Sequence, residues 1–264
     1  MYDCHIHSNF SLDSELTAEK ACEKAMELKL DGIIFTDHYD YDYPDFDLKF
    51  NIDFENYFKY MKELKLKYKD QLKVLNGLEL GIQPHVAEQS RKIVEGYDFD
   101  FVIMSVHIID RMDPYTQKYY EGKTKYQADM RYLEEIRNTM KLFDNFDVLG
   151  HIGYIRRYSC FEDKSLSCSD YGDIIDEILS EVIKNGKGIE INTSGYRSLG
   201  TPIPDFDIVQ RYRELGGEII TLGSDSHNAE HIGWGFAETL DKMKAIGFNY
   251  VAHFEGRKPV FEKI

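Results

Sequence analysis

The sequence predicts an α/β barrel in which parallel strands alternate with helices packed outside them. Seven short apolar segments rich in β-forming residues are separated by longer segments of helical period, a pattern typical of parallel strands covered by helices. Histidines and carboxylates follow almost every one of these strands. An open sheet would gather its functional residues at one switch point. A closed or nearly closed barrel therefore fits better, because its active site draws on the carboxyl ends of all strands.

The expected strands cover residues 3–7, 32–36, 73–80, 99–106, 146–151, 188–192 and 218–223. The first helix is expected to begin after Thr17, whose hydroxyl can accept a hydrogen bond from the first turn. Apolar stripes predict further helices over residues 174–183 and 206–215, the latter ended by Gly216-Gly217. No Pro/Gly/Ser-rich linker and no break in composition divides the chain, so we expect one domain over residues 1–264.

The charge balance narrows the class of partner. The formal net charge is −15, whereas a nucleic-acid surface needs clustered lysine and arginine, so no nucleic-acid partner is expected. A small phosphorylated substrate is compatible with this acidity, because bound divalent ions can reverse the local field. The 19 tyrosines and 16 phenylalanines could line a pocket or fill a large core.

Targeting features are missing from the sequence. The first residues show no basic segment followed by an apolar one, which a secretory signal would have. No apolar run reaches the roughly 18 residues of a membrane span, so no membrane partner is expected. The four cysteines are irregularly spaced without a CxxC pair, which favours a reduced, cytoplasmic protein. The sequence does not indicate the oligomeric state.

Six of the nine histidines lie at or just beyond the end of an expected strand: His5, His7, His38, His107, His151 and His227. The first two point to one face of their strand, because side chains alternate with period two, and can bind one metal ion. Asp225 and His227 repeat this spacing after the last strand. Each histidine alone could be a hydrogen-bonded core residue. The ordered set predicts a metal site.

Carboxylates accompany these histidines. Glu79 lies within the apolar run Gly77-Leu78-Glu79-Leu80-Gly81, where a charge is costly unless it binds a metal or, as the alternative, pairs with a neighbouring strand. Asp37 precedes His38 and could orient its imidazole. Nitrogen and oxygen ligands without cysteine suit zinc, manganese or iron. Their number exceeds one tetrahedral site, so two or three divalent metal ions are expected.

This ordered set resembles the PHP (polymerase and histidinol phosphatase) family of metal-dependent phosphoesterases. The resemblance covers essentially the whole chain and rests on His5-x-His7, Thr36-Asp37-His38, Glu79, Ser105-Val106-His107, Gly150-His151 and Asp225-x-His227. The length and the lack of appended domains resemble the histidinol-phosphatase branch. The resemblance implies a distorted (β/α)7 TIM-like barrel with a trinuclear metal centre.

The resemblance also implies three sets of metal ligands. One metal would be held by His5, His7, Glu79 and Asp225. A second would use Glu79 as a bridge, together with His107 and His151. A third would be held by His38, His227 and Asp13. Asp13 is the least certain member in the family pattern, where a histidine can stand instead, and it could belong to the polar turn before the first helix.

Multi-metal hydrolysis suggests the chemistry. Metal ions lower the pKa of bound water and neutralise the phosphoryl oxygens during in-line attack, so no separate strong base is required. We assign direct catalytic roles to Asp225, His227 and His38. Either Asp225 or His227 could protonate the leaving alkoxide.

Arginine offers paired donors to phosphate oxygens. Arg156 and Arg197 follow expected strands and are the expected phosphate clamps, with solvated loop arginines as the alternative. The tyrosine-rich loops after His38 and His107 are expected to close over a substrate. The first of these loops could favour a cationic amine or be an ordinary solvated acidic loop, since it contains Asp40, Asp42, Asp45 and Asp47.

These expectations predict a metal-dependent phosphomonoesterase, and the resemblance implies hydrolysis of L-histidinol phosphate to L-histidinol and phosphate in histidine biosynthesis. The alternatives within the family are phosphatases for phosphotyrosine proteins or other small phosphomonoesters. A non-enzymatic, metal-stabilised scaffold would lack some ligands. A nuclease would need a basic groove, and the arginines argue against hydrolysis of a non-phosphate bond.

Overall fold

The structure is a computed structural model that describes residues 1–44 and 50–264. Its main sheet has parallel strands in the order β1 (Tyr2–Ile6), β2 (Gly32–Phe35), β4 (Lys73–Gly81), β5 (Phe101–Ser105), β6 (Val148–Leu149), β7 (Gly188–Asn192) and β8 (Ile220–Gly223). The two outer strands meet at their carboxyl ends. Ile6 forms a parallel bridge with Ser226, and the backbone N–H of His7 donates to the Ser226 carbonyl oxygen at 2.9 Å. The predicted TIM-like barrel of seven parallel strands is confirmed, and it is nearly closed.

The predicted strands are all present, and the main sheet contains one short strand that was not predicted. β3 (His38–Asp40) follows β2 after a break at Thr36 and Asp37, and pairs with the carboxyl end of β4, where His38 lies opposite Glu79. Three residues are too few to show a periodic signal. Because of this pairing, His38 lies level with Glu79 at the carboxyl end of the barrel.

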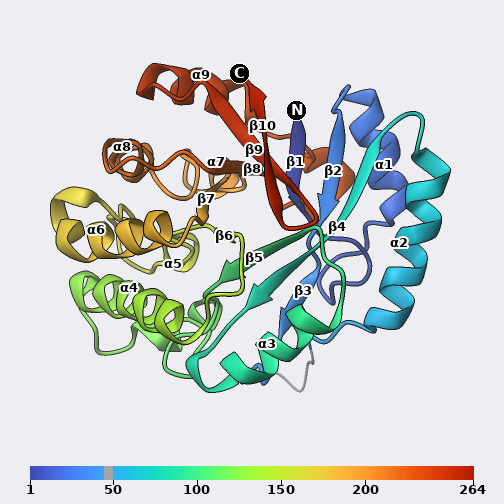
Figure 1. Cartoon of the computed structure of the whole chain (residues 1–264). Coiled ribbons are helices and arrows are strands. Elements are labelled where there is room, and N and C mark those ends of the chain that lie inside the picture. The colour runs from blue at the N-terminus through green and yellow to red at the C-terminus, as the bar shows by residue number, and fades with distance from the viewer. Residues whose placement is uncertain (45–49) are drawn as a thin grey trace.

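Helices surround the strands on the outside (Figure 1). They are α1 (Ala18–Glu27), α2 (Phe54–Tyr68), α3 (Ala87–Gly96), α4 (Lys125–Leu142), α5 (Ile155–Tyr158), α6 (Cys168–Lys184), α7 (Gly195–Ser198), α8 (Phe206–Glu214) and α9 (Phe236–Ile246). Thr17 caps α1, as predicted, by accepting a hydrogen bond from the Lys20 N–H. The other two predicted helices correspond to α6 and α8. No helix in the described residues is long and apolar enough to cross a membrane.

A hairpin that the sequence analysis missed closes the amino-terminal end of the barrel. Its strands β9 (Tyr250–Glu255) and β10 (Lys258–Lys263) are antiparallel. Phe254 of β9 stacks on Phe101 inside the barrel, with ring centroids 5.1 Å apart. The resulting interior cluster also contains Cys4, Ile34, Leu75, Ile103 and Val148. The interior at this end is therefore packed with apolar side chains, whereas the histidines of the predicted site lie at the carboxyl ends.

Candidate metal centre

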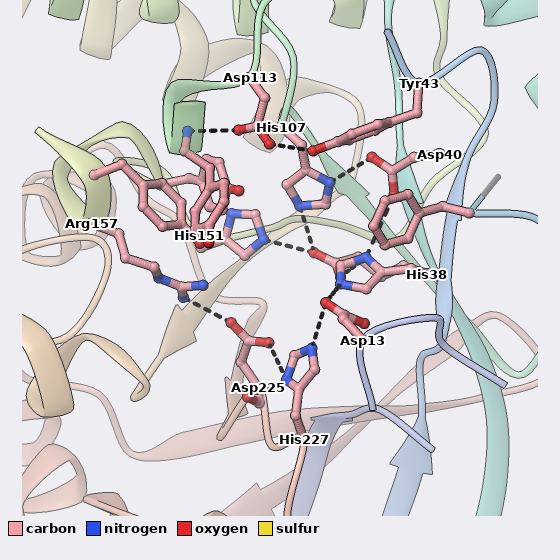
Figure 2. A pocket seen from close by; sticks show the side chains of 15 residues that line it. Asp13, His38, Asp40, Tyr43, His107, Asp113, His151, Arg157, Asp225 and His227 are labelled. Carbon is pink, nitrogen blue, oxygen red and sulfur yellow. Dashed lines mark hydrogen bonds and ion pairs between the residues drawn. The ribbon is translucent and has the colours of Figure 1, made fainter. Parts of the chain in front are cut away.

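A cavity of about 470 Å³ opens at the carboxyl ends of the strands (Figure 2). Its lining combines histidines, carboxylates, one arginine and several aromatic rings. The described residues that line it are Asp13, His38, Asp40, Tyr43, Phe50, Glu79, His107, Asp113, Tyr115, His151, Tyr154, Arg157, Tyr158, Asp225 and His227. Ligands from distant parts of the chain meet here because every parallel strand ends at this rim.

Glu79 lies at the centre of this site and is buried. Its Oε1 atom is 2.7 Å from His151 Nε2 and 3.2 Å from His107 Nε2. Its Oε2 atom is 2.9 Å from His38 Nδ1, 3.2 Å from His5 Nε2 and 3.5 Å from His7 Nε2. The carboxylate thus faces one group of histidines with each oxygen, as a bridging ligand does.

The donor atoms fit bound cations. Among the described residues, Glu79 Oε2 is buried without a hydrogen bond, although three histidine rings surround it. His5 Nε2 and His7 Nε2 also face each other at 3.0 Å. Lone pairs that converge in a buried space are unfavourable unless a proton or a metal ion lies between them. Histidine nitrogen and carboxylate oxygen are the ligands that zinc, manganese and iron accept.

Hydrogen bonds on the far side of each ring set the orientation of His5 and His7. His5 Nδ1 lies 2.5 Å from Glu190 Oε1. His7 Nδ1 lies 3.1 Å from the Ser11 hydroxyl, which donates to Asp37 at 2.7 Å. A carboxylate can only accept, so Nδ1 of His5 carries the proton and Nε2 faces the site. Asp37, expected to orient His38, instead acts on His7 through Ser11.

His107 is held in the same way by Asp40, whose Oδ1 lies 2.8 Å from His107 Nδ1. Burial opposes charge on both groups, but in the metal-free protein their mutual attraction outweighs it. The pKa of His107 is raised to about 10 by Asp40 and Glu79, and the pKa of Asp40 is lowered to about 2 by His107 and His38. Asp40 is therefore a buried partner of the metal centre and not part of a solvated acidic loop.

Asp225 connects the last strand to this site. It adopts a left-handed backbone with φ of 51°, which aspartate tolerates better than most residues. Its Oδ1 lies 3.3 Å from His7 Nε2, and its Oδ2 accepts a hydrogen bond from Arg157 at 2.8 Å. Burial raises the pKa of Asp225, but the positive charge of Arg157 and neighbouring histidines holds it well below its usual range.

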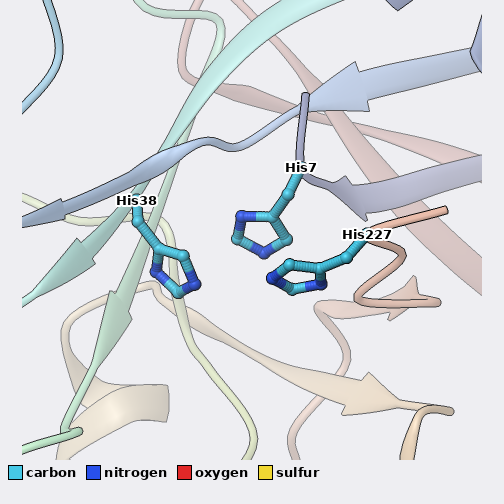
Figure 3. A group of neighbouring side chains, drawn as sticks. All are labelled: His7, His38 and His227. Atoms are coloured by element: carbon cyan, nitrogen blue, oxygen red, sulfur yellow. The ribbon is translucent and has the colours of Figure 1, made fainter. Parts of the chain in front are cut away.

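A third group of ligands combines the buried His7 with two partly exposed side chains that line the cavity. His7, His38 and His227 converge (Figure 3), each with one ring nitrogen within 4.8 Å of the others. Asp13 Oδ2 lies 3.2 Å from His227 Nε2 and 3.7 Å from His38 Nε2. Asp13, with 45% of its side chain exposed, therefore points at two histidines and does not merely belong to a polar turn.

The structure brings together all three ligand sets that the resemblance implied. The ligand atoms of His5, His7 and Asp225 lie within 4.8 Å of one another, and Glu79 Oε2 lies 3.2 Å from His5 Nε2. The second set forms around Glu79 Oε1, and the third around Asp13 Oδ2. The three histidines left out of the predicted site, His85, His231 and His253, are not among the residues that line the cavity.

The two predicted phosphate clamps occupy other positions. Arg156 is buried, with its guanidinium 2.9 Å from Asp205 and donating to the carbonyl oxygens of Lys164 and Pro202. Arg197 donates to the carbonyl oxygens of Ser224 and Asp225. Neither arginine is among the residues that line the cavity. Their role in substrate binding is not supported by this position and stays a prediction. Arg157 is the one that lines the cavity.

Aromatic side chains from loops form the outer walls of the cavity. Tyr43 and Phe50 lie on one side, with ring centroids 4.8 Å apart. On the other side Tyr158 packs edge-on against both Tyr115 and Tyr154. Tyr43 and Tyr115 come from the loops after His38 and His107, which were expected to lie over a substrate. Asp45 and Asp47 of the first loop lie outside the described residues.

Two residues of the site could have been found from the sequence, and one could not. Glu190 is a charge within the apolar strand Gly188–Asn192, so the argument applied to Glu79 would have identified it. Asp40 lies two residues after the ligand His38, and therefore on the same face of β3. Arg157 differs from Arg156 only by its direction on the short helix α5, which the sequence does not determine.

The family model of the PHP domain matches residues 3–194, which is more than half of the chain. The chain therefore belongs to the PHP family.

Within that family, this chain is similar to several histidinol-phosphatases. The histidinol-phosphatase of Lactococcus lactis is 34% identical over 257 residues, which cover 97% of this chain and 95% of that protein. The probable histidinol-phosphatase of Clostridium acetobutylicum is 36% identical, with 91% of both chains covered. The crystal structure of the L. lactis enzyme with zinc, L-histidinol and phosphate superposes with a TM-score of 0.92, at 33% identity and with 98% of both chains covered.

Proposed function

We propose that this chain is a metal-dependent phosphoric monoester hydrolase that converts L-histidinol phosphate to L-histidinol and phosphate, a step of histidine biosynthesis. One observation carries the proposal: the buried Glu79 carboxylate lies within 3.5 Å of five histidine rings, in a cavity that also contains Arg157. The relatives that bind zinc, histidinol and phosphate or are named histidinol-phosphatase support the substrate.

The proposed metal ligands are those of the three sets: His5, His7, Asp13, His38, Glu79, His107, His151, Asp225 and His227. We propose two or three divalent ions, with zinc supported by the L. lactis structure. When bound, such ions act as Lewis acids on phosphoryl oxygens and lower the pKa of water. His5, His7 and His107 contribute by presenting Nε2 to the ions in a fixed direction.

Arg157 is the proposed phosphate clamp. Among the described residues that line the cavity it is the only arginine or lysine. Asp225, at 2.8 Å, holds its guanidinium beside the metal ligands, and its carbon Cζ lies 5.5 Å from the Tyr154 ring centre. A guanidinium in this position offers directed donors to a phosphoryl group bound at the centre.

The leaving alkoxide needs a proton, for which Asp225 and His227 were the two candidates. The carboxylate of Asp225 is buried and paired with Arg157, and its pKa is held well below its usual range. Such a group is a poor acid. We therefore propose that the alkoxide is protonated at the cavity mouth, next to His227, whose side chain is 28% exposed. His38 lies beside it and would help to orient the departing group.

The aromatic walls suit the organic part of the substrate. Tyr43, Phe50, Tyr154 and Tyr158 leave a space in which a flat, cationic ring can be stacked. The expectation of a cytoplasmic, single-domain enzyme over residues 1–264, without nucleic-acid or membrane partners, belongs to the same proposal. Its cytoplasmic part is supported by the four cysteines, which are all unpaired at described positions.

The test is phosphate release by the metal-reconstituted protein from histidinol phosphate, phosphotyrosine and p-nitrophenyl phosphate, compared by kcat/KM. We expect a preference for histidinol phosphate of several orders of magnitude, which Glu79→Ala and His107→Ala should abolish. Similar, weak release from all three would overturn the substrate and keep the phosphatase. No release with zinc, manganese or iron would overturn the enzyme and favour a scaffold.

A further inference from the structure

A buried carboxylate in the middle of β7 contacts two of the proposed metal ligands, the ring of one and the backbone of the other, on the side away from the metal centre. Glu190 is 1% exposed. Its Oε1 atom lies 2.5 Å from His5 Nδ1, and its Oε2 atom accepts hydrogen bonds from the backbone N–H of His151 at 2.9 Å and from Asn192 Nδ2 at 3.3 Å. Both oxygens are therefore used. One side chain ties the imidazole on β1 to the backbone that follows β6.

Asp40 makes the equivalent contact on the other side of the centre. It is 4% exposed, and its Oδ1 atom lies 2.8 Å from His107 Nδ1. Its Oδ2 atom lies 3.5 Å from His38 Nδ1. Again a carboxylate contacts two ligands that come from different strands.

Glycines on neighbouring strands make room for both carboxylates. A Cβ atom added to Gly223 on β8 would lie 2.3 Å from Glu190 Oε1 and 2.4 Å from His5 Cβ. A Cβ atom added to Gly81 on β4 would lie 1.8 Å from Asp40 Oδ1. No side chain larger than hydrogen fits at either position without displacing the carboxylate. The backbone is thus shaped around these two contacts.

From these contacts we propose that Glu190 and Asp40 are positioning residues that hold the Nδ1 protons of His5 and His107, so that each Nε2 is presented to a metal ion. The inference rests on the proposed metal centre. A carboxylate cannot donate, so it fixes the remaining ring proton on Nδ1 once the metal has displaced the proton from Nε2. His151 differs, because its Nδ1 has no hydrogen-bond partner among the described residues. Its ring is held only from the Nε2 side, and its backbone by Glu190.

Zinc affinity in the absence of substrate tests this role. Glu190→Ala and Asp40→Ala should each weaken zinc binding at one site by about 10- to 100-fold in competition with a chelator. Asp40→Asn keeps an oxygen that can accept from His107 and should remain close to wild type. Glu190→Gln should be intermediate, since its amide cannot accept from both His5 and the His151 N–H. This order distinguishes the loss of an acceptor from the loss of volume.

The matched control is Asp147→Ala, which removes a buried carboxylate at the opposite end of the barrel, where it contacts Arg257 and the Val102 N–H. It should lower the thermal stability and leave the zinc affinity unchanged. If the two alanine variants near the centre behave like this control, Glu190 and Asp40 have only a structural role and the proposal is overturned. If either alanine variant does not fold, Glu190→Gln still gives the comparison, because it is expected to bind zinc more weakly than the control, and an unchanged affinity in this variant would overturn the proposal.

Histidine ¹⁵N spectra of the zinc-loaded protein give a readout that is independent of affinity. Among the slowly exchanging Nδ1–H signals, one should be lost in Glu190→Ala and another in Asp40→Ala, whereas the signal of His7, which is bonded to Ser11, should remain in both. Unchanged signals in both variants would overturn the proposal. A wild-type protein that binds zinc but releases no phosphate from histidinol phosphate would instead contradict the proposed substrate, so the two failures are distinguishable.

Discussion

At the scale of single residues, the site depends on which direction each side chain takes. Arg156 and Arg157 are neighbours on α5, yet the first contacts Asp205 in the protein interior and the second contacts Asp225 in the cavity. Neighbouring residues on a helix point about 100° apart, so one of them faces the cavity and the other does not. Their substitutions should therefore have different effects.

Arg157→Ala should lower kcat/KM for histidinol phosphate by about 10- to 100-fold, the value of one charge-assisted hydrogen bond. In the zinc-loaded protein its thermal stability should change little, because Asp225 keeps a bound cation and His7, at 3.3 Å, as partners. Arg156→Ala should instead destabilise the fold by about 3 kcal/mol, because it leaves Asp205 without its partner, while the folded protein keeps its activity. Steady-state kinetics and denaturant titration of both variants measure this. The reverse result would make Arg156 the phosphate clamp.

The ionisation of His107 and His7 predicts a pH dependence of metal binding. In the metal-free protein, burial lowers the pKa of His107 but the carboxylates of Asp40 and Glu79 outweigh it and raise it to about 10. Burial and the nearby His227 and His38 lower the pKa of His7 to about 3. At neutral pH, His107 must therefore lose a proton to bind zinc, whereas His7 is already neutral.

Zinc affinity should accordingly increase with pH through the neutral range, and binding should release protons. The stability that protonated His107 gives the metal-free protein is fully present below pH 6.5, the ordinary pKa of histidine, and is lost as the pH rises towards about 10. Calorimetry in buffers of different ionisation enthalpy measures the protons released. Binding without net proton release at pH 7 would contradict this assignment.

At the scale of elements, period and end signals located the seven parallel strands and three of the helices. Two β-elements, the strand β3 and the hairpin, were not predicted because their signals are tertiary. β3 has three residues and is defined by its pairing with β4. In the hairpin, β9 is mostly buried and β10 mostly exposed. Neither strand alternates between buried and exposed residues, because the barrel covers β9 as a whole.

The hairpin should stabilise the barrel through Phe254. Phe254→Ala should cost about 3 to 5 kcal/mol, as for other buried phenylalanines, because it leaves a cavity above Phe101. Phe261→Ala on the same hairpin is the control. Phe261 is 46% exposed, so the change should stay within about 0.5 kcal/mol. Denaturant unfolding monitored by circular dichroism compares the two.

Activity per folded molecule should survive Phe254→Ala, because the metal centre lies at the opposite end of the barrel. A loss of kcat without a loss of stability would show that the hairpin acts on the site directly.

At the scale of the whole molecule, the metal centre joins the two ends of the parallel sheet. His5 and His7 end β1, whereas Asp225 and His227 follow β8, and the backbone contacts between these segments are few: the Ile6–Ser226 bridge and its neighbouring hydrogen bonds. Bound ions would add coordination bonds between the segments that end β1 and follow β8. Folding and metal binding should therefore be coupled.

Removal of the metal should lower the melting temperature. At a free zinc concentration of about 1,000 times Kd, one site stabilises the folded state by about 4 kcal/mol, which corresponds to roughly 10 °C for a domain of this size. Calorimetric scans with and without a chelator measure the difference. In Glu79→Ala, which lacks the bridging ligand, the chelator should change the melting temperature much less. An equal shift in this variant would place the stabilising ion elsewhere.

The sequence by itself determined the class of fold and the set of residues that we propose as ligands. Strand–helix alternation is a local pattern, and the position of a histidine at a strand end is visible without knowing the neighbouring strand. Parallel strands must end on the same rim, so His5, Glu79 and Asp225 could be brought together by argument alone.

Only the tertiary structure decided which groups form hydrogen bonds with the far side of these imidazole rings. The partner of His5 is Glu190, 185 residues away, and the partner of His7 is a serine held by Asp37. Arg157 and not Arg156 faces the cavity. These choices depend on side-chain directions and on close approaches that glycines such as Gly223 permit. No local pattern encodes them, because each is a property of two or more segments packed together.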